Sequence, residues 1–521
     1  MKPQIHADKH MAFEALLAEY EARRAKALAG GGAEKYAKRT AAGVWNARER
    51  IAYLVDKGSF IESGLFGASG VYPEQADETQ TDGKLAGYAR INGRDVCIVV
   101  NDFTVKGAST SATNSKKIAH MKRAATERGM PLVVIGESTG ARLPDAMGSR
   151  GMGLLLGNDI TQFRRLRETP MCAAALGPSF GSSTWLTCQA DFSVMQKGAV
   201  VAVSSPRLVS MALGEKVDPE DLGGWRLHAE VTGLVDQVVD KEEEVFDAIK
   251  HFLSYLPGHH MEAPPDAPVP AGSGADMDKV FSVLPESRTQ VYDMKRIICA
   301  IVDQDTLFEL KPRFGKSAVV GLARLGGRSV GIVANNPLHR GGALDADACR
   351  KIVDFLVLCD SFNVPIVLLV DTPGFQIGTE AERAGAPGKI MNFMNAMTLL
   401  TVPRLSVIIR KSYGRAYVCM GGGRHSDDVA AWPTAEVSFM SPEFATKIVH
   451  GVGVGEPGFE EKLREIQKDA DVWGLAEVYA AQAVIRPEET RDYLNRMLDV
   501  YRLRATKGVG QHLMRNWPTS Y

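Results

Sequence analysis

The chain has 521 residues, of which 45% are hydrophobic and 24% are charged, a composition typical of a soluble globular protein with a large core. This composition excludes an intrinsically disordered chain. The 61 basic and 62 acidic side chains give a formal net charge of −1, which argues against nucleic acid or an anionic membrane as the main partner.

In chain order, the first predicted elements are a strand at 96–100, a helix at 115–128, a strand at 131–135 and a strand near 171–176. A second series follows, with strands at 330–334, 365–370 and 404–409 and a helix at 346–359. Short β-branched runs that alternate with helices are typical of parallel βαβ units with right-handed crossovers. The sequence therefore predicts the α/β class.

The two series belong to an internal repeat. Residues 87–94 (GYARINGR) reappear as 321–328 (GLARLGGR), an offset of 234 residues. The offset then holds without a gap through Asn101 and Asn335, Gly107 and Gly341, Pro131 and Pro365, and Gly140 and Gly374. Further along the register slips by one residue, so that 179–182 match 412–415. We therefore expect two copies of one fold.

A proline-rich segment separates the two copies. Residues 264–270 (PPDAPVP) and 272–274 (GSG) cannot continue a helix or a sheet and favour a semi-rigid spacer. We expect a first domain at residues 1–262, a linker at 263–278 and a second domain at 279–521.

The seven cysteines contain no Cys-x-x-Cys pair, so neither a disulfide framework nor a zinc ribbon is predicted. This usage favours a cytoplasmic protein. The N-terminus shows no apolar stretch with a small-residue cleavage site, and no run reaches the ~18 apolar residues of a membrane span. His259 and His260 lie in the inter-copy segment, and His339, His425 and His450 lack ligand spacing, so no metal site is predicted.

Each copy has glycine-bearing turns at the carboxyl ends of two strands, where ligands of α/β folds gather. These turns occupy 136–142 and 177–183 in the first copy, and 371–375 and 411–416 in the second. A glycine turn that leads into a helix exposes backbone N–H groups able to hold a developing oxyanion. One such turn is also compatible with an unliganded helix start, but two at matched positions favour oxyanion holes.

Two motifs suggest other chemistries. Residues 136–140 (GESTG) match the nucleophile elbow of serine hydrolases around Ser138. The matching place in the second copy reads DTPG at 371–374, and no local signature marks a partner histidine. This DTPG also resembles a GTPase motif, yet Gly388-Lys389 is followed by Ile390 and lacks the upstream glycine of a P-loop. Hydrolysis and nucleotide chemistry are therefore disfavoured.

Further segments carry a family resemblance along nearly the whole chain: 46–51 (NARERI), 101–105 (NDFTV), 138–142 (STGAR), 221–224 (DLGG), 253–257 (LSYLP), 371–375 (DTPGF), 432–436 (WPTAE) and 485–487 (IRP). With them the sequence resembles the carboxyltransferase (β) subunits of biotin-dependent acyl-CoA carboxylases of the propionyl-CoA and methylcrotonyl-CoA type. The resemblance implies two tandem crotonase-like domains, acyl-CoA side first and biotin side second.

The resemblance implies transfer of CO₂ from N1-carboxybiotin to the α-carbon of an acyl-CoA, without a side-chain nucleophile. By the family pattern, the catalytic N–H groups belong to Gly181, Ser182 and Ser183 on the acyl-CoA side and to Arg415 and Ala416 on the biotin side. The same pattern implies a substrate-binding role for Gly140, Ala141, Gly374, Phe375, Tyr417 and Val418.

The sequence departs from the family pattern at both turns. Relatives usually have paired glycines where this chain has Gly181-Ser182. The propionyl-type pattern Gly-Ala-x-Asp is replaced by Arg-Ala-Tyr-Val at 415–418. Arg415 resembles the methylcrotonyl branch, and Val418 makes the predicted acyl pocket more apolar, so the identity of the acyl group stays open. The Arg415 side chain could equally lie on the surface.

The chain contains no ATP-grasp-like half and no Met-Lys-Met biotin-attachment sequence. The resemblance therefore implies that biotin is carried by another chain, a biotin carboxylase/biotin carboxyl carrier subunit. It also implies a homohexamer with active sites between chains. A biotin-dependent acyl-CoA decarboxylase, which runs the same step backwards, remains an alternative. A non-catalytic CoA-binding scaffold is another, because serines replace glycine at 182 and 183.

Overall fold

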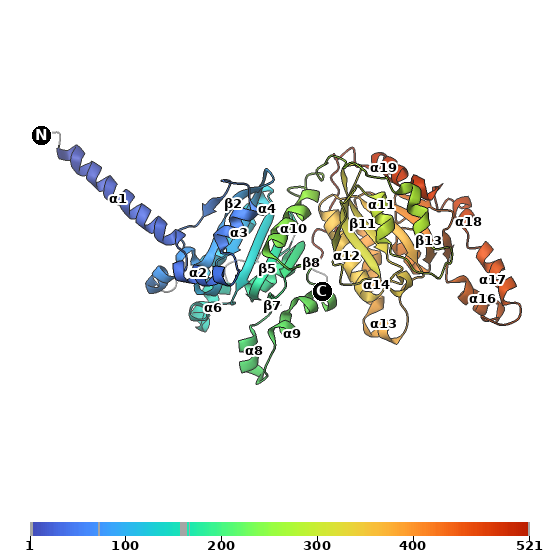
Figure 1. The fold of residues 1–521 in the computed structure, drawn as a ribbon, viewed down its shortest axis with the longest axis horizontal. Helices are drawn as coiled ribbons and strands as arrows, with labels where there is room; N and C mark the ends of the chain where they lie inside the picture. The colour runs from blue at the N-terminus through green and yellow to red at the C-terminus, as the bar shows by residue number, and fades with distance from the viewer. Residues whose placement is uncertain (1–3, 71–72, 157–163, 166, 519–521) are drawn as a thin grey trace. The chain divides into compact units, whose positions relative to one another are not determined.

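The computed structural model describes residues 4–70, 73–156, 164–165 and 167–518. The chain divides into two compact units. The first comprises Met1–Arg165, Thr169–His228 and Val238–Lys250, and the second comprises Leu166–Glu168, Ala229–Gln237 and His251–Tyr521. Each unit contains its own sheet, flanked by helices (Figure 1).

The first sheet has the strand order β1-β2-β3-β4-β5-β6-β8, with β7 paired to β5. Its strands are β1 (Ile61–Ser63), β2 (Lys84–Ile91), β3 (Arg94–Asn101), β4 (Leu132–Ser138), β5 (Met171–Phe180), β6 (Phe192–Gln196), β7 (Val200–Ala202) and β8 (Gln237–Val239). The helices of this part are α1 (Gln4–Leu28), α2 (Ala33–Ala41), α3 (Ala47–Leu54), α4 (Ala112–Arg128), α5 (Leu143–Ala146), α6 (Gly148–Leu156), α7 (Ser182–Gln189), α8 (Pro206–Leu213), α9 (Pro219–Gly223) and α10 (Glu242–Tyr255).

The second sheet has the order β16-β14-β13-β12-β11-β10-β9, with β15 paired to β13. Its strands are β9 (Phe308–Leu310), β10 (Ala318–Leu325), β11 (Arg328–Asn335), β12 (Ile366–Thr372), β13 (Arg404–Tyr413), β14 (Asp428–Ala431), β15 (Glu436–Ser438) and β16 (Ala483–Val484). Its helices are α11 (Lys295–Ile301), α12 (Ala346–Ser361), α13 (Thr379–Arg383), α14 (Ala386–Leu399), α15 (Arg415–Cys419), α16 (Pro442–His450), α17 (Phe459–Lys468), α18 (Val472–Glu477) and α19 (Thr490–Tyr501).

The strand registers of the two sheets match. Cys97 of β3 lies opposite Leu132 of β4, and Gly331 of β11 lies opposite Ile366 of β12, which reproduces the 234-residue offset. Strands β3, β4 and β5 are parallel, as are β11, β12 and β13. The prediction of two tandem α/β domains built on one fold is confirmed.

The hairpin that opens each parallel series is also repeated. Strands β2 and β3 are joined through Asn92 and Gly93, whose φ values are +50° and +77°. Two successive left-handed residues suit the right-handed twist of the strands, and Asn-Gly adopts them at low cost. The Asp56 carboxylate accepts hydrogen bonds from both backbone N–H groups of this turn, at 3.0 and 2.7 Å. In the second unit Asp303 does the same for Gly326 and Gly327.

Each sheet packs its own core. In the first unit the core includes Val99 and Leu132 from the sheet and Met121 from α4. In the second unit α11 and α19 cover the sheet with buried apolar side chains such as Ile298 and Leu494. These cores fix the strand ends from which the turns described below project.

The proline-rich segment lies against the second unit. Residues 263–270 form neither helix nor strand, and the Ala267 N–H donates to the carbonyl of Gly327 at 2.9 Å. Arg324 donates to the carbonyl of Pro265 at 2.9 Å. No helix in the described part of the chain combines the length and the apolar character that crossing a membrane requires.

Candidate active site

The predicted acyl-side turn follows β5. Gly181 has φ +63° and ψ −119°, a conformation that L side chains rarely adopt, and α7 begins at the next residue. No side chain caps this helix start. The first backbone N–H groups of a helix have no partner within it. Ser182 and Ser183 therefore present amide donors at the positive end of α7, a position that suits an anionic ligand oxygen.

A second turn packs beside the first. Gly140, with φ +97°, follows β4, and Ala141 forms a parallel bridge with Thr110. The Thr110 N–H donates to the Gly140 carbonyl at 2.8 Å, and the Arg142 N–H donates to the Thr110 carbonyl at 2.8 Å. A Cβ on Gly181 would lie 3.5 Å from the Gly140 Cα and 3.9 Å from the Ala141 nitrogen. The two turns thus bring the amide of Ala141 close to the start of α7.

The second unit repeats both turns. Gly414, with φ +60° and ψ −143°, connects β13 to α15. Gly374, with φ +122°, follows β12, and Phe375 forms a parallel bridge with Leu344. A Cβ on Gly374 would lie 3.7 Å from the carbonyl oxygen of Tyr413, so the two turns are again neighbours. We call each pair of turns an amide cradle. The first consists of Gly140–Ala141 with Gly181–Ser183, and the second consists of Gly374–Phe375 with Gly414–Ala416.

A buried hydroxyl shapes the first turn of each pair. The Ser138 hydroxyl donates to the Ala108 carbonyl at 3.1 Å and accepts from the Gly140 N–H at 3.2 Å. The Thr372 hydroxyl occupies the matched position and makes the corresponding contacts with Gly342 and Gly374. Because Ser138 is 0% exposed and both its hydrogen bonds serve the backbone, it is not the exposed nucleophile of a hydrolase elbow.

The side chains of the two serines make different contacts. The Ser182 hydroxyl lies 2.5 Å from the Thr110 hydroxyl. The buried Ser183 hydroxyl lies 3.4 Å from the amide nitrogen of Asn101, which also donates to the Glu137 carbonyl at 3.0 Å. Both contacts hold the start of α7 against neighbouring elements, and neither needs the backbone N–H of the serine.

Asn101 is oriented by a buried lysine that sequence reasoning missed. The Lys84 ammonium donates to the Asn101 side-chain oxygen at 3.0 Å and to the Ala108 carbonyl at 3.2 Å. Burial lowers the pKa of Lys84 to about 7. The only sequence signal for this site was that Asn101 recurs as Asn335. That signal did not point to Lys84, because the residue paired with Asn335 across the hairpin is Ala318, whereas the residue paired with Asn101 is Lys84.

Buried carboxylates at the ends of β4 and β12 were also missed. Glu137 pairs with Arg39 at 2.6 Å and with Arg50 at 2.5 Å. Asp371, 0% exposed, accepts from Arg410 at 2.9 Å and from the Tyr292 hydroxyl at 2.9 Å. These ion pairs fix the strand ends that carry Gly140 and Gly374. Their arginines come from elements far apart in the chain, so spacing gave no signal.

The predicted residues around α15 fall into two groups. Arg415 has an exposed side chain and Ala416 is buried, and both present amides of the first turn. The Tyr417 hydroxyl accepts from the Gly423 N–H at 2.9 Å, and burial raises the pKa of Tyr417. Tyr417 thereby holds the loop after α15, and Val418 is partly buried in the same helix. The catalytic and substrate-binding roles assigned to these residues stay a prediction.

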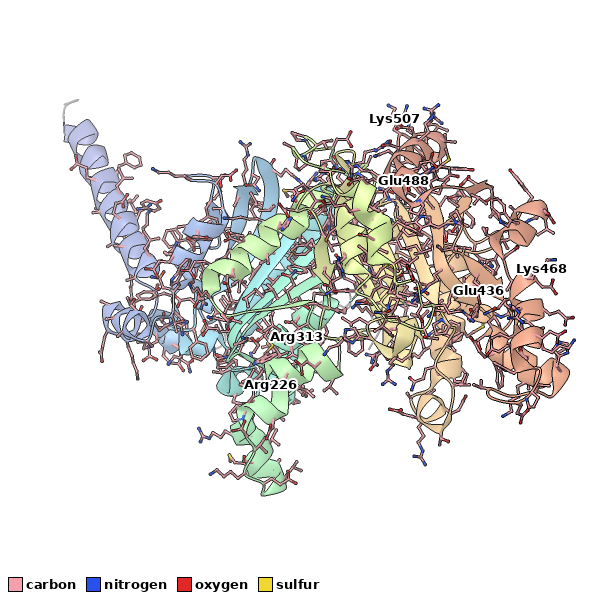
Figure 2. All side chains as sticks on the ribbon, turned by 45° about the vertical axis from the view of Figure 1, so that its right-hand side comes forward. Arg226, Arg313, Glu436, Lys468, Glu488 and Lys507 are labelled. Atoms are coloured by element: carbon pink, nitrogen blue, oxygen red, sulfur yellow. The ribbon has the colours of Figure 1, made fainter. Side chains whose placement is uncertain are left out.

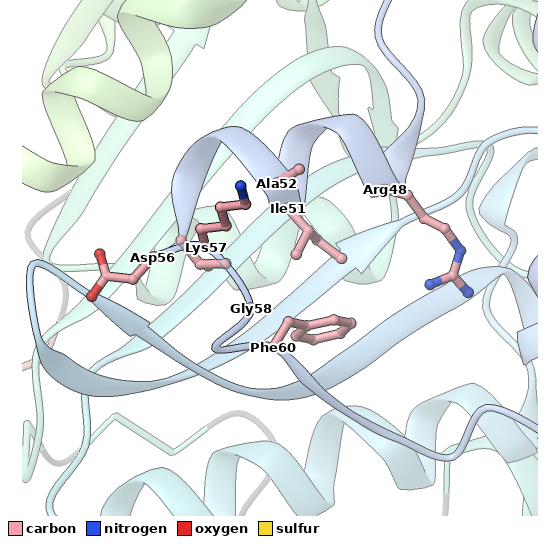
Figure 3. Close-up of a pocket in the computed structure, with 8 residues that line it drawn as sticks. Arg48, Ile51, Ala52, Asp56, Lys57, Gly58 and Phe60 are labelled. Carbon is pink, nitrogen blue, oxygen red and sulfur yellow. The ribbon is translucent and has the colours of Figure 1, made fainter.

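A separate pocket of about 440 Å³ lies in the first unit, lined by residues of α3 and of the loop that follows it (Figure 3). Ile51 and Phe60 supply apolar walls, while Arg48 and Lys57 supply charged ones. None of its eight lining residues belongs to either cradle. Among the residues that the structure describes, no cluster of His, Cys, Asp and Glu could hold a metal ion.

A family model described as the carboxyl transferase domain matches residues 38–511. The chain is 33% identical over 515 residues to a propionyl-CoA carboxylase carboxyltransferase subunit of Haloferax mediterranei, covering 96% of this chain and 98% of that one. It is 33% identical over 472 residues to a methylmalonyl-CoA decarboxylase subunit alpha of Veillonella parvula, covering 90% and 92%. The crystal structure of transcarboxylase 12S with methylmalonyl-CoA bound matches with a TM-score of 0.86 and 30% identity, covering 93% and 95%.

Proposed function

The chain belongs to the carboxyl transferase family of acyl-CoA carboxylase β subunits, and we propose that its two matched cradles stabilise the two oxyanions of the transfer. The enzyme transfers a carboxyl group to an acyl-CoA. The observation that supports the proposal is the repetition of one construction, a left-handed glycine at a helix start packed against a second glycine turn, in both units.

On the acyl-CoA side, negative charge develops on the thioester oxygen as the α-carbon becomes nucleophilic. In the proposal the amides of Ala141, Ser182 and Ser183, the last two at the uncapped start of α7, donate to that oxygen. Backbone donors fixed by the fold need no reorganisation during the reaction. The serines that replace glycine in the family pattern leave these N–H groups intact, which argues against a scaffold without activity.

On the biotin side, negative charge develops on the ureido oxygen. In the proposal the amides of Phe375, Arg415 and Ala416 donate to it from the second unit. Biotin, when bound, supplies the carboxyl group and, after giving it up, a base for the α-proton. The residues of this chain hold the acyl-CoA and the carboxylated biotin next to each other in a fixed orientation, and this proximity supplies much of the rest of the rate enhancement.

We further propose that biotin arrives on a separate carboxylase/carrier chain and that the chain assembles with copies of itself. The Haloferax mediterranei relative is itself named a subunit, and the transcarboxylase structure describes a hexamer assembly. Helices α8 and α16 occupy matched repeat positions and lie at the edges of their units (Figure 1). Both expose large apolar side chains, including Met211 at 71% and Ile448 at 62%, as expected of surfaces that a second copy covers. In this assembly the first unit of one copy serves the second unit of another.

We also propose that the reaction takes place in the cytoplasm. The seven cysteines are scattered along the chain without a Cys-x-x-Cys pair, a usage that suits a reducing compartment.

The experiment is a carboxyl-transfer assay on the full chain with carboxylated biotin carrier and a panel of acyl-CoAs, from acetyl to branched and aromatic. We expect transfer to at least one acyl-CoA. Absence of transfer to every member of the panel would contradict the proposal. Turnover found only for decarboxylation of a carboxyacyl-CoA would assign the reverse direction.

A further inference from the structure

The two cradles differ in the side-chain contacts of the strand that leads into each of them, β5 in the first unit and β13 in the second. The last residue of β13 before Gly414 is Tyr413, whereas Phe180 occupies the matched position in β5. Tyr413 is 1% exposed, and its hydroxyl donates to the Glu436 carboxylate and accepts from Arg288 at 2.7 Å. Burial and the hydrogen bond to Glu436 raise the pKa of Tyr413, so the hydroxyl remains a donor at neutral pH.

Arg288 connects three elements at this point. One of its guanidinium nitrogens donates to Tyr413 and to Glu436 of β15, the latter at 2.6 Å. The other donates to Glu443, in the first turn of α16, at 2.6 Å. Glu436 can be located in Figure 2. A planar guanidinium with several fixed donors suits this kind of bridge, because it orients every partner at once.

The backbone around Arg288 is held by the same strand whose end it binds. Arg410 of β13 donates to the carbonyls of Ser287 at 3.3 Å and of Gln290 at 3.2 Å. Lys411 donates to the carbonyl of Arg288 at 3.3 Å. Side chains of β13 thus bind the backbone of residues 287–290, and the Arg288 side chain of this segment binds Tyr413 at the end of β13.

The first unit has no counterpart of these groups in its sequence. The positions that match Arg410, Lys411 and Tyr413 hold Gly177, Pro178 and Phe180, which carry no charge and no hydroxyl. The Arg415 and Ala416 amides of the Gly414 turn stand two and three residues beyond Tyr413. Their direction therefore depends on a polar network that the Gly181 turn does not use.

We propose that Arg288 is a positioning residue for the cradle at Gly414: by holding Tyr413, Glu436 and Glu443 together it fixes the direction of the Arg415 and Ala416 amides. This inference rests on the proposed function, which gives that cradle the biotin side. Because Glu443 belongs to α16, Arg288 also connects the cradle to a helix whose exposed apolar face is offered to a second copy.

The test uses Arg288→Met, Arg288→Lys and Tyr413→Phe in the full chain, with Lys279→Met as the control, since Lys279 forms an exposed ion pair with Asp276. Carboxyl transfer gives kcat and the KM for carboxylated biotin carrier, calorimetry gives the Kd for acyl-CoA, and thermal unfolding gives Tm. We expect Arg288→Met to lower kcat by roughly 10- to 100-fold, because small misplacements of catalytic groups cost that much. The control should match the wild type.

Tyr413→Phe should lower kcat in the same direction by a smaller factor, and Arg288→Lys should recover part of the rate. The Kd for acyl-CoA should stay at the wild-type value in every variant, because the acyl-side cradle is untouched. If Arg288→Met does not fold, Tyr413→Phe decides the matter, since phenylalanine occupies the matched position, Phe180, at the end of β5.

A lower Tm with wild-type kcat and KM in Arg288→Met and Tyr413→Phe would overturn the inference, because it would assign a purely structural role. A wild-type enzyme that transfers carboxyl to no acyl-CoA would instead overturn the proposed function. The two failures are therefore distinguishable.

Discussion

Gly181 and Gly414 adopt the same unusual backbone conformation at the same place in the two copies, with φ of +63° and +60° and ψ of −119° and −143°. Each follows a long parallel strand and directly precedes a helix that no side chain caps. Divergent side chains surround them, yet the direction of the following amides is retained. Ser182 and Arg415, which follow these glycines, therefore begin their helices from the same backbone conformation although their side chains differ.

Alanine at either glycine is expected to slow carboxyl transfer strongly. A Cβ at Gly414 would approach the Phe439 carbonyl to 3.1 Å, and both positions impose a conformation that costs an L residue about 1–3 kcal/mol. The relief of that strain rotates the next amide away from the oxyanion, and we expect a loss in kcat of about 100-fold. Gly388→Ala is the matched control, because a Cβ there meets nothing within 4 Å. Equal activity of all three variants would contradict the role of the turns.

Substitution of Ser138 separates carboxyl transfer from serine hydrolysis. Ser138→Thr copies the residue at the matched position, Thr372, and should leave kcat close to that of the wild type. Ser138→Ala loses two hydrogen bonds to the backbone and should destabilise the first unit by about 1–3 kcal/mol without abolishing transfer. Labelling of Ser138 by a serine-directed fluorophosphonate, with loss of activity, is the result that this account does not allow.

Buried Lys84 should make stability depend on pH. Its pKa is lowered to about 7 by burial, against 10.5 in the unfolded chain, so between these values the unfolded chain binds a proton that the folded chain lacks. The cost of burying the amine is therefore complete below pH 7 and falls as the pH rises towards 10. Relative to Lys84→Met, the Tm of the wild type should rise between pH 7 and pH 9.5.

Lys279→Met provides the control for this pH series, because Lys279 is exposed and its pKa is raised by the hydrogen bond to Asp276. Its Tm should follow that of the wild type across the same range. A Tm difference between the wild type and Lys84→Met that stays constant from pH 7 to pH 9.5 would contradict the lowered pKa.

Glu137→Gln should destabilise the protein strongly. The carboxylate is 3% exposed and lies between the guanidinium groups of Arg39 and Arg50. Arg50 also pairs with buried Glu242, so without the Glu137 charge two guanidinium groups face a single carboxylate and one positive charge is left uncompensated. We expect the free energy of unfolding to fall by about 3–5 kcal/mol in denaturant titration. Asp95→Asn breaks the solvent-exposed pair with Arg90 and should cost far less, because water screens an exposed ion pair. Similar losses in both variants would be incompatible with a buried ion pair at β4.

Local patterns predicted the repeated framework correctly. The β-branched run at 96–100 lies within β3, the helix expected at 346–359 lies within α12, and the one-residue slip reappears where Met171 and Arg404 face matched residues of β4 and β12. These features depend on neighbours in sequence and on the repeat itself. The positive φ of Gly181 and Gly414 also follows from local sequence, because a glycine stands at the matched strand-to-helix turn of both copies.

Features that depend on distant contacts could not be predicted. Nothing in the spacing of the chain links Arg288 to Tyr413, or Arg39 to Glu137, because these pairs meet only after the strands have assembled. The burial of Lys84 was equally invisible, since a lysine in a strand is usually solvated. Nothing local in the sequence indicates that residues 229–237 group with the second unit.

The most direct test of the two-cradle account compares the amide with the side chain at the first helical position of each cradle. Ser182→Ala and Arg415→Ala keep the backbone N–H, whereas Ser182→Pro and Arg415→Pro remove it at a position that tolerates proline. In the carboxyl-transfer assay we predict that both alanine variants remain active and that both proline variants lose about 100-fold or more in kcat. Folded proline variants with wild-type kcat, or alanine variants as impaired as the proline ones, would contradict the account.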